Sequence, residues 1–125
     1  MDDIKKKILI VEDNEALSDI YQARLDLEGF ETKLEADGEK ALAEAVEYKP
    51  DLILLDVVMP QIDGFNVLDI LKNTEKTKDI KIIILTALSQ VRDKEHAVEL
   101  GADDFLVKSE TDLDSVVECI QKHLG

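Results

Sequence analysis

Four short runs of apolar residues constrain the possible fold more than any other feature of the chain. They cover Ile8 to Val11, Leu52 to Leu55, Ile82 to Leu85 and Phe105 to Val107. Each run is too short for a buried helix, and most are rich in branched side chains, so they are predicted to be strands. Because the runs are continuous, both faces should be covered, as is typical of parallel strands. The more polar segment from Glu31 to Ala36 is predicted to be an edge strand.

Segments with helical spacing separate these strands. The first, about Asn14 to Glu28, ends at Gly29, which suits a left-handed C-terminal cap. Its predicted inward residues are Leu17, Ile20, Ala23 and Leu27. The last helix has an apolar face and a capping box formed by Thr111 and Asp114. That face comprises Leu113, Val116, Val117, Ile120 and Leu124. The fourth helix, about Gln90 to Leu100, has few apolar residues, so we expect it to be held more loosely.

The order of elements is five repeats of a strand followed by a helix. This order predicts an α/β fold, a doubly wound open parallel sheet with right-handed crossovers and helices on both faces. A chain of 125 residues, 45% of them apolar, can build one sizeable core. We therefore expect a single domain over residues 1–125, with its core at about 6–124.

The charge of the chain is strongly negative. There are 29 acidic and 15 basic residues, which give a formal net charge of -14. Such a surface would repel DNA and anionic membranes, so the sequence predicts no direct nucleic-acid partner and no membrane partner. Charged residues follow Met1, and no stretch approaches the ~20 apolar residues of a membrane span. The predicted location is the cytoplasm.

Polar residues follow four of the five predicted strands. Glu12 and Asp13 follow the first, Asp56 the third, Thr86 the fourth and Lys108 the fifth. Ligands of open α/β sheets bind outside the carboxyl ends of the strands, so these groups should share one rim. Individually, each could be a helix cap or a solvated side chain. Together, however, three carboxylates would raise one another's pKa unless a cation neutralises them.

The residue types at this rim indicate a particular chemistry. Carboxylate and carbonyl oxygens are the ligands that suit Mg²⁺. The Lys108 ammonium could offset the acids directly, but with the Thr86 hydroxyl it also suits a phosphate group. An aspartate carboxylate can accept a phosphoryl group covalently. The rim is therefore a candidate site for phosphoryl transfer.

Five segments resemble the receiver domains of two-component response regulators, and the likeness runs from about Lys6 to Leu124. The segments are Ile8-Leu9-Ile10-Val11-Glu12-Asp13, Asp51-Leu52-Ile53-Leu54-Leu55-Asp56-Val57-Val58-Met59-Pro60, Asp63-Gly64, Leu85-Thr86-Ala87 and Gly101-Ala102-Asp103-Asp104-Phe105-Leu106-Val107-Lys108. In this order and spacing they are highly specific. The resemblance implies a flavodoxin-like sheet with strand order 2-1-3-4-5.

The resemblance also implies a role for each site residue. Asp56 would be the phosphoacceptor. The Mg²⁺ ligands would be Glu12, Asp13, Asp56 and the backbone carbonyl of Val58. The phosphoryl oxygens would be held by Thr86, the Ala87 amide and Lys108. Phe105, which the sequence alone would place as a core aromatic, would act with Thr86 as a switch.

The same resemblance implies partners and a mode of action. The phosphodonor would be a sensor histidine kinase, a histidine phosphotransfer protein or a small phosphodonor. The switch would change partner binding through the face formed by helix 4, strand 5 and helix 5. The receiver would act on a downstream protein target or on a fused output domain. It would assist its own phosphorylation and dephosphorylation without being an enzyme in the ordinary sense.

One departure from the family pattern concerns the lysine loop. Ser109 stands where the family usually has a proline joined by a cis bond, and a cis bond before serine costs ~3 kcal/mol. The sequence leaves open whether the Lys108–Ser109 bond is cis or trans, and therefore how the lysine sits.

Three other functions are alternatives to the phosphorylation switch. A receiver-like interaction module would never be phosphorylated. A carrier of a nucleotide or flavin mononucleotide would need a small-residue turn after the first strand, where Glu12-Asp13-Asn14-Glu15 would repel a phosphate. An aspartate-based phosphatase would normally have a second acid at the position of Val58. The sequence also leaves open whether the chain is a stand-alone regulator or part of a longer protein.

Overall fold

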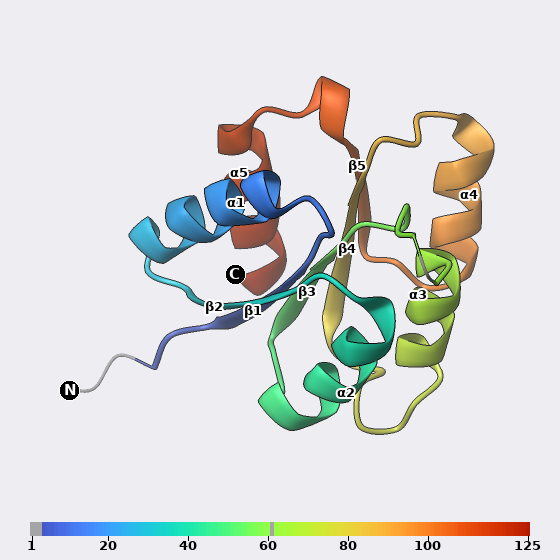
Figure 1. Ribbon diagram of the computed structural model, residues 1–125, viewed down its shortest axis with the longest axis horizontal. Coiled ribbons are helices and arrows are strands. Elements are labelled where there is room, and N and C mark those ends of the chain that lie inside the picture. The colour runs from blue at the N-terminus through green and yellow to red at the C-terminus, as the bar shows by residue number, and fades with distance from the viewer. Residues whose placement is uncertain (1–3, 61) are drawn as a thin grey trace.

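A twisted parallel sheet lies between two layers of helices in the computed structural model, which describes residues 4–60 and 62–125 (Figure 1). The strands are β1 (Lys7–Val11), β2 (Glu31–Glu35), β3 (Leu52–Leu55), β4 (Lys81–Thr86) and β5 (Asp104–Val107). They are hydrogen-bonded in the order β2-β1-β3-β4-β5, and every pairing is parallel. The predicted α/β class and strand order are confirmed.

Two helices cover one face of the sheet and three cover the other. The helices are α1 (Glu15–Leu27), α2 (Gly38–Tyr48), α3 (Gly64–Lys72), α4 (Val91–Glu99) and α5 (Leu113–Leu124), with a short 3-10 turn, η1 (Lys108–Glu110), after β5. Helices α1 and α5 lie on one side of the sheet, and α2, α3 and α4 lie on the other (Figure 1). None of the helices in the described ranges is long and apolar enough to cross a membrane.

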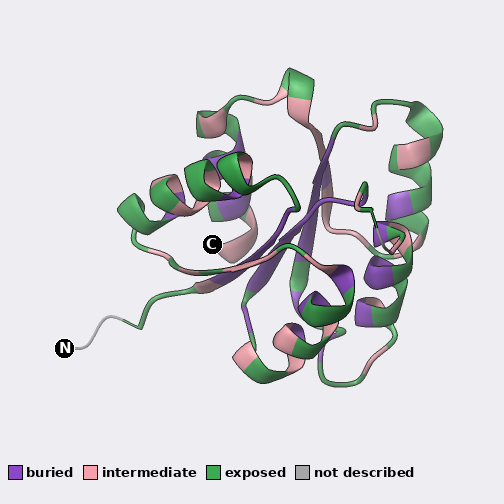
Figure 2. Ribbon diagram, in the orientation of Figure 1, coloured by how far each residue is buried: buried purple, intermediate pink, exposed green. Residues whose placement is uncertain are grey.

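Each central strand contributes side chains to two separate cores. Leu9 and Ile53 point into the core beneath α2, α3 and α4, while Ile8 and Leu52 point into the core beneath α1 and α5. Successive strand residues point to opposite faces, so a strand covered on both sides must be apolar throughout. The buried strands therefore form the middle of the molecule (Figure 2). Strand β2 has no buried residue, as predicted for an edge strand.

The predicted inward face of the first helix is wrong. Ile20 and Leu27 are 51% and 85% exposed, whereas Ser18 and Leu25 are buried. The helix is rotated so that Leu25 packs into the core together with Tyr21. A polar Ser18 can occupy the inner face because its hydroxyl donates a hydrogen bond to the Glu15 carbonyl, at 3.0 Å.

The start of the last helix also differs by one residue from the prediction. Asp112, rather than Thr111, is the N-cap, and its carboxylate accepts a hydrogen bond of 2.8 Å from the Ser115 amide. The predicted apolar face is correct, because Val116, Val117 and Ile120 are buried. The cap therefore shifts without rotating the face of the helix.

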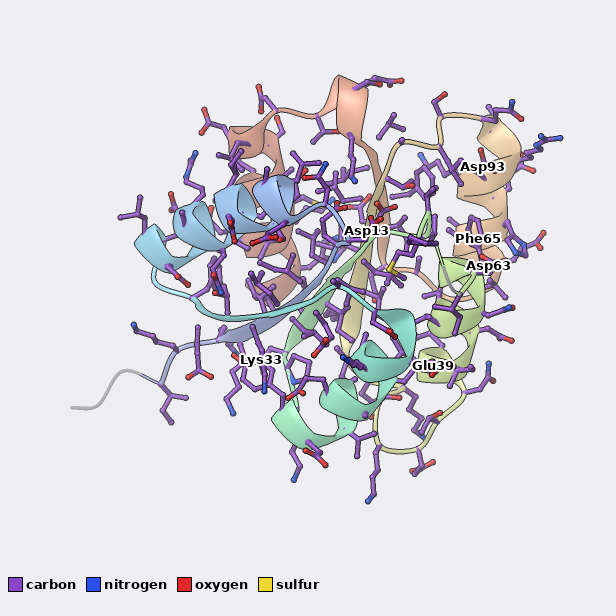
Figure 3. The ribbon with its side chains drawn as sticks, viewed as in Figure 1. Asp13, Lys33, Glu39, Asp63, Phe65 and Asp93 are labelled. Atoms are coloured by element: carbon purple, nitrogen blue, oxygen red, sulfur yellow. The ribbon has the colours of Figure 1, made fainter. Side chains whose placement is uncertain are left out.

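Helix α4 has few buried side chains, in agreement with the sequence. Ala97 is its one buried residue within the described chain, and Val91 and Val98 are 72% and 57% exposed. The ring of His96 meets that of Phe65, which reaches toward α4 from α3 (Figure 3). Because little apolar area anchors this helix, loose attachment stays our expectation for it.

A matched pair of substitutions tests the orientation of α1. Leu25→Ala should lower the free energy of unfolding by about 2–5 kcal/mol, because it leaves a cavity in a packed core. Leu27→Ala should change it by no more than about 0.5 kcal/mol, because that side chain is exposed. Urea denaturation of both variants measures the difference. Equal losses, or a larger loss at Leu27, would show that the helix faces the sheet in another way.

Candidate functional site

The carboxyl ends of the strands bring the predicted site residues to one rim. Parallel pairing places Val11 beside Leu55, and the Asp56 amide continues that ladder by donating to the Val11 carbonyl at 3.0 Å. Glu12 and Asp56 are therefore the first residues beyond two neighbouring strands. Asp13, which is labelled in Figure 3, follows the end of β1, and its carboxylate lies close to those of Glu12 and Asp56. The topology thus joins residues that are more than forty positions apart in the sequence.

A lysine contacts both buried acids at this rim. Lys108 Nζ lies 2.8 Å from Asp56 Oδ2 and 2.5 Å from Glu12 Oε1. The side chains of Glu12 and Asp56 are only 4% and 5% exposed, and that of Lys108 is 19% exposed. Two carboxylates so far from water require a partner of opposite charge. The ammonium of Lys108 supplies it.

The second oxygen of each buried acid is held by the backbone. Asp56 Oδ1 accepts a hydrogen bond of 2.9 Å from the Val58 amide. Glu12 Oε2 accepts one of 3.0 Å from the Asn14 amide. Both carboxylates are therefore fixed in orientation by one oxygen and paired with Lys108 through the other.

Burial and charge pairing shift the pKa values of Glu12 and Lys108. Burial raises the pKa of Glu12, although hydrogen bonds from Lys108 and the Asn14 amide act in the opposite direction. Burial alone would lower the pKa of Lys108, but the hydrogen bonds and charges of Asp56 and Glu12 outweigh it, and the pKa is raised. Lys108 therefore stays charged at neutral pH.

The three acids are arranged as a cation site would require. Glu12, Asp13 and Asp56 each offer a carboxylate oxygen, and these oxygens lie within 4.8 Å of one another. Asp13 is exposed, so a hydrated cation could reach it from solvent. An all-oxygen donor set of this kind fits Mg²⁺, which keeps several of its waters. The residues present therefore fit the predicted metal.

Thr86 and Ala87 end the neighbouring strand at the same rim. Thr86 is completely buried, and its hydroxyl oxygen accepts a long hydrogen bond of 3.4 Å from the Leu88 amide. Ala87 is exposed immediately after β4. Phe105, on β5, is 8% exposed and packs in the core beneath α2, α3 and α4. The ring thus occupies a buried position next to the strand that carries Thr86.

The lysine loop resolves the question left open by Ser109. The described residues contain no cis peptide bond, so the Lys108–Ser109 bond is trans. Lys108 nevertheless reaches both Glu12 and Asp56 from the first position of the turn η1. A trans bond before serine is thus compatible with a lysine at the site.

Two features near the rim were not predicted. The ring of Tyr21 lies close to the acids: burial raises its pKa, and the charges of Lys108, Glu12 and Asp56 also act on it. The place of Tyr21 beside the acids could have been predicted only if the inward face of α1 had been predicted correctly. A depression of about 260 Å³ also opens beside Asp13, lined by residues such as Asp37 and Met59. It gives the rim an approach from solvent.

The loop after Asp56 is held close by a glycine. A Cβ atom on Gly64 would lie 2.2 Å from the Val57 Cα and 2.9 Å from the Asp56 carbonyl oxygen. Only a residue without a side chain lets the start of α3 approach the backbone of the site so closely. Gly64 therefore supports the position of Asp56.

Comparisons with known proteins agree with this arrangement. The family model described as "response regulator receiver domain" matches residues 8–121. A relative in Synechocystis sp., the DNA-binding dual master transcriptional regulator RpaA, is 43% identical over 82% of this chain and 42% of its own length. The probable transcriptional regulator ycf27 of Cyanophora paradoxa is 46% identical over 83% of this chain and 42% of its own.

Solved structures show the same likeness. The chemotaxis protein CheY4 of Vibrio cholerae superposes with a TM-score of 0.88 at 28% identity, over 95% of this chain and 98% of that one. The match thus covers nearly all of that crystallised chain, whereas this chain spans less than half the length of the curated relatives it matches.

The prediction that excluded a nucleic-acid partner is wrong. It is overturned by the relatives, since RpaA is named as DNA-binding and both curated relatives are named as transcriptional regulators. The net charge of -14 describes only the surface of these 125 residues. It has no bearing on the rest of a longer protein, which can carry its own charge distribution.

The family is shown by independent observations. The strand order is that of the resemblance, the family model covers most of the chain, and the relatives exceed 40% identity. The resemblance noted in the sequence is thereby confirmed. The chain belongs to the response regulator receiver domain family, a family of signalling proteins.

Proposed function

We propose that this chain is a phosphorylation-dependent signalling switch in which Asp56 accepts a phosphoryl group. The observation that carries the proposal is the pairing of a buried Asp56 with Lys108 beside two further acids. A helix cap or a turn residue would not need a partly buried ammonium as its partner. The proposal also explains why the acids remain together, because a bound cation and a phosphoryl group would both use them.

The transfer itself requires little of the protein beyond positioning and charge. One carboxylate oxygen of Asp56 forms a bond to phosphorus. The phosphorus–nitrogen bond of a phosphohistidine, or the phosphorus–oxygen bond of acetyl phosphate, breaks, and the leaving group keeps the electron pair. The Val58 amide, already bonded to Asp56 Oδ1, would hold the carboxylate in place meanwhile.

The metal ligands in this proposal are Glu12, Asp13, Asp56 and the backbone carbonyl of Val58. When bound, Mg²⁺ would supply positive charge that offsets the acids and the phosphoryl oxygens. The Asn14 amide orients the Glu12 carboxylate at this position by donating a hydrogen bond to its Oε2 atom. Neutralisation of the acids is what allows an anionic phosphodonor to approach them.

Lys108, Thr86 and the Ala87 amide would hold the transferred phosphoryl group. An acyl phosphate carries more negative charge than the carboxylate it replaces, so the Lys108 ammonium is drawn toward it. The Thr86 hydroxyl has an accepting role in its contact with Leu88, which leaves its proton available for a phosphoryl oxygen. Lys108 would thus exchange one anionic partner for another.

When Thr86 moves toward the phosphoryl group, Phe105 would change position and transmit the phosphorylation state to the face formed by α4, β5 and α5. A depression of about 310 Å³ lies on this face, and Val91, Lys94 and Phe105 are among the residues that line it. The sparse burial of α4 favours rearrangement there. We assign output to this face, toward a downstream protein target or a fused output domain, with residues 1–125 as a single receiver domain.

The phosphodonor in the proposal is a sensor histidine kinase, a histidine phosphotransfer protein or a small phosphodonor. The receiver assists both its own phosphorylation and its dephosphorylation. Because RpaA is named as a DNA-binding transcriptional regulator and ycf27 as a probable transcriptional regulator, both of greater length, a fused DNA-binding domain is one form of output in this proposal.

The phosphoacceptor is tested by intact-mass spectrometry after incubation with acetyl phosphate and Mg²⁺. The wild-type protein should gain the mass of a phosphoryl group, and Asp56→Asn should not, because an amide is a poor nucleophile. Asp63→Asn is the matched control. Asp63 caps α3 by accepting from the Phe65 amide at 2.9 Å, and asparagine can keep that bond. The control should therefore gain mass as the wild type does.

Two results would sink the assignment of Asp56. One is a wild-type mass that stays unchanged under these conditions. The other is an equal gain by wild type and Asp56→Asn. Omission of Mg²⁺ or addition of a chelator should suppress the gain by the wild type, and an unaffected gain would contradict the role given to the metal.

The charge balance predicts how a lysine variant depends on pH. Lys108→Met removes the partner that holds down the pKa of Glu12, so this pKa should rise further above 4.5. Folded protein then binds more protons than unfolded protein between 4.5 and the raised pKa, and stability falls as pH rises through that window. Without Mg²⁺, the variant should lose about 1–3 kcal/mol at about pH 7 and less at about pH 5.

A second lysine supplies the control for this experiment. Lys33 pairs with Glu44 at 2.5 Å on the surface, and its side chain is 46% exposed. Lys33→Met should therefore cost little, with no difference between the two pH values. Urea denaturation relative to wild type at each pH gives both results. A loss for Lys108→Met that grew toward low pH would contradict the assigned charge balance.

A further inference from the structure

A second cluster of potential metal ligands lies away from the acidic rim. Asp104 begins β5, whereas the rim lies at the carboxyl ends of the strands, so the two sites are at opposite ends of β5. Cys119 and His123 stand four residues apart on α5, which places them on one face of that helix. Nothing in the proposed phosphoryl transfer uses these three side chains.

The side chains of Cys119 and His123 both contact one carboxylate oxygen of Asp104. Asp104 Oδ2 lies 3.2 Å from Cys119 Sγ and 3.0 Å from His123 Nε2. The other oxygen, Oδ1, accepts a hydrogen bond of 2.9 Å from the Phe105 amide, which fixes the carboxylate. Potential ligand atoms of all three residues lie within 4.8 Å of one another. The backbone therefore fixes the orientation of the Asp104 carboxylate, with Oδ2 directed at the other two side chains.

The two contacts with Asp104 Oδ2 are close to the ligand separations of a tetrahedral metal site. Zinc bonds of about 2.3 Å to sulfur and about 2.0–2.1 Å to nitrogen or oxygen imply ligand separations of roughly 3.3–3.6 Å. The observed contacts with Asp104 are shorter by only a few tenths of an ångström. Small side-chain rotations would therefore admit an ion, and the side chains of His123 and Asp104, at 17% and 29% exposed, leave a path from solvent.

The donor atoms of this cluster favour a different cation from the one that the acidic rim favours. Thiolate and imidazole suit zinc, whereas Mg²⁺ prefers oxygen. A thiolate and a carboxylate together carry the charge that balances a divalent ion, with His123 neutral. The simpler explanation is a hydrogen-bonded Asp–His pair joining β5 to α5. That pair does not explain why a cysteine thiol occupies the third corner and donates to the same oxygen.

We propose that Asp104, Cys119 and His123 form a second metal site that takes Zn²⁺, with water in the fourth position. On binding, the thiol proton passes to solvent and the sulfur bonds to the metal as a thiolate. Without the ion the thiol stays protonated, because burial and the neighbouring Asp104 raise the pKa of Cys119 to about 12. The metal would tie the start of β5 to the last turns of α5.

Cobalt spectroscopy tests the site without reference to phosphorylation. Reduced protein is titrated with Co²⁺ in excess Mg²⁺, which keeps the acidic rim from binding cobalt. We expect a thiolate-to-cobalt charge-transfer band, saturation at about one ion per chain, and loss of the band when Zn²⁺ is added. Cys119→Ser should abolish the band, and His123→Gln should weaken cobalt binding by about ten-fold or more.

Two variants serve as controls. His96→Gln removes the other histidine, which contacts Phe65 on the opposite face of the sheet, and should bind cobalt as the wild type does. Asp56→Asn disables the proposed phosphoacceptor and should also keep the band. Failure of the phosphorylation proposal would therefore leave this result unaffected, and the reverse holds as well.

Several outcomes would overturn the proposal. These are the absence of the band in the wild type, its persistence in Cys119→Ser, or its loss in Asp56→Asn. Far-UV circular dichroism checks that each variant is folded. Should Cys119→Ser fail to fold, His123→Gln decides the question, and an unchanged cobalt affinity in that variant would overturn the site.

Discussion

At the rim of the sheet one lysine pairs with two buried carboxylates, and both the stability and the proposed chemistry of the rim depend on that pairing. Parallel apolar strands carry Glu12 and Asp56 to the edge of a dry core, where both are almost inaccessible to water. Their charges would be costly there without Lys108, which approaches from a loop ninety-six residues beyond Glu12. The contacts of Lys108 with the two acids therefore join β5 to β1 and β3 at the rim, and a phosphoryl group and a cation could rearrange these contacts. Stability and the proposed switching draw on the same contacts.

The two ends of β5 carry different chemistry on one rigid sheet. Lys108 follows its carboxyl end and faces an all-oxygen cluster, while Asp104 begins the strand and faces sulfur and nitrogen. Phe105 lies between them, with its amide bonded to Asp104 and its ring in the core. The proposed magnesium and zinc sites are thus separated by donor type as well as by position. Binding at one does not require the ligands of the other.

The parallel sheet could be predicted from the sequence because continuous apolar strands alternate with helices, whereas the strand order was implied only by the resemblance to receiver domains. Once the strand order is fixed, Glu12, Asp13 and Asp56 must meet. The face of α1 could not be predicted, because burial of Ser18 depends on a hydrogen bond to its own helix. The cluster of Asp104, Cys119 and His123 was missed because it exists only after α5 packs on β5. Finally, the net charge led to a wrong prediction about nucleic acid. It is the charge of these 125 residues alone, whereas the curated relatives are more than twice as long as the segment that they share with this chain.

The most direct test of the account is to locate the phosphoryl group chemically. Borohydride reduces an aspartyl phosphate to homoserine, which peptide mass spectrometry can assign to a position in the chain. After incubation with acetyl phosphate and Mg²⁺, we expect homoserine at position 56, with Asp13 and Glu12 unchanged. Homoserine at another acid, or a phosphorylated protein that yields none, would show that Asp56 is not the phosphoacceptor.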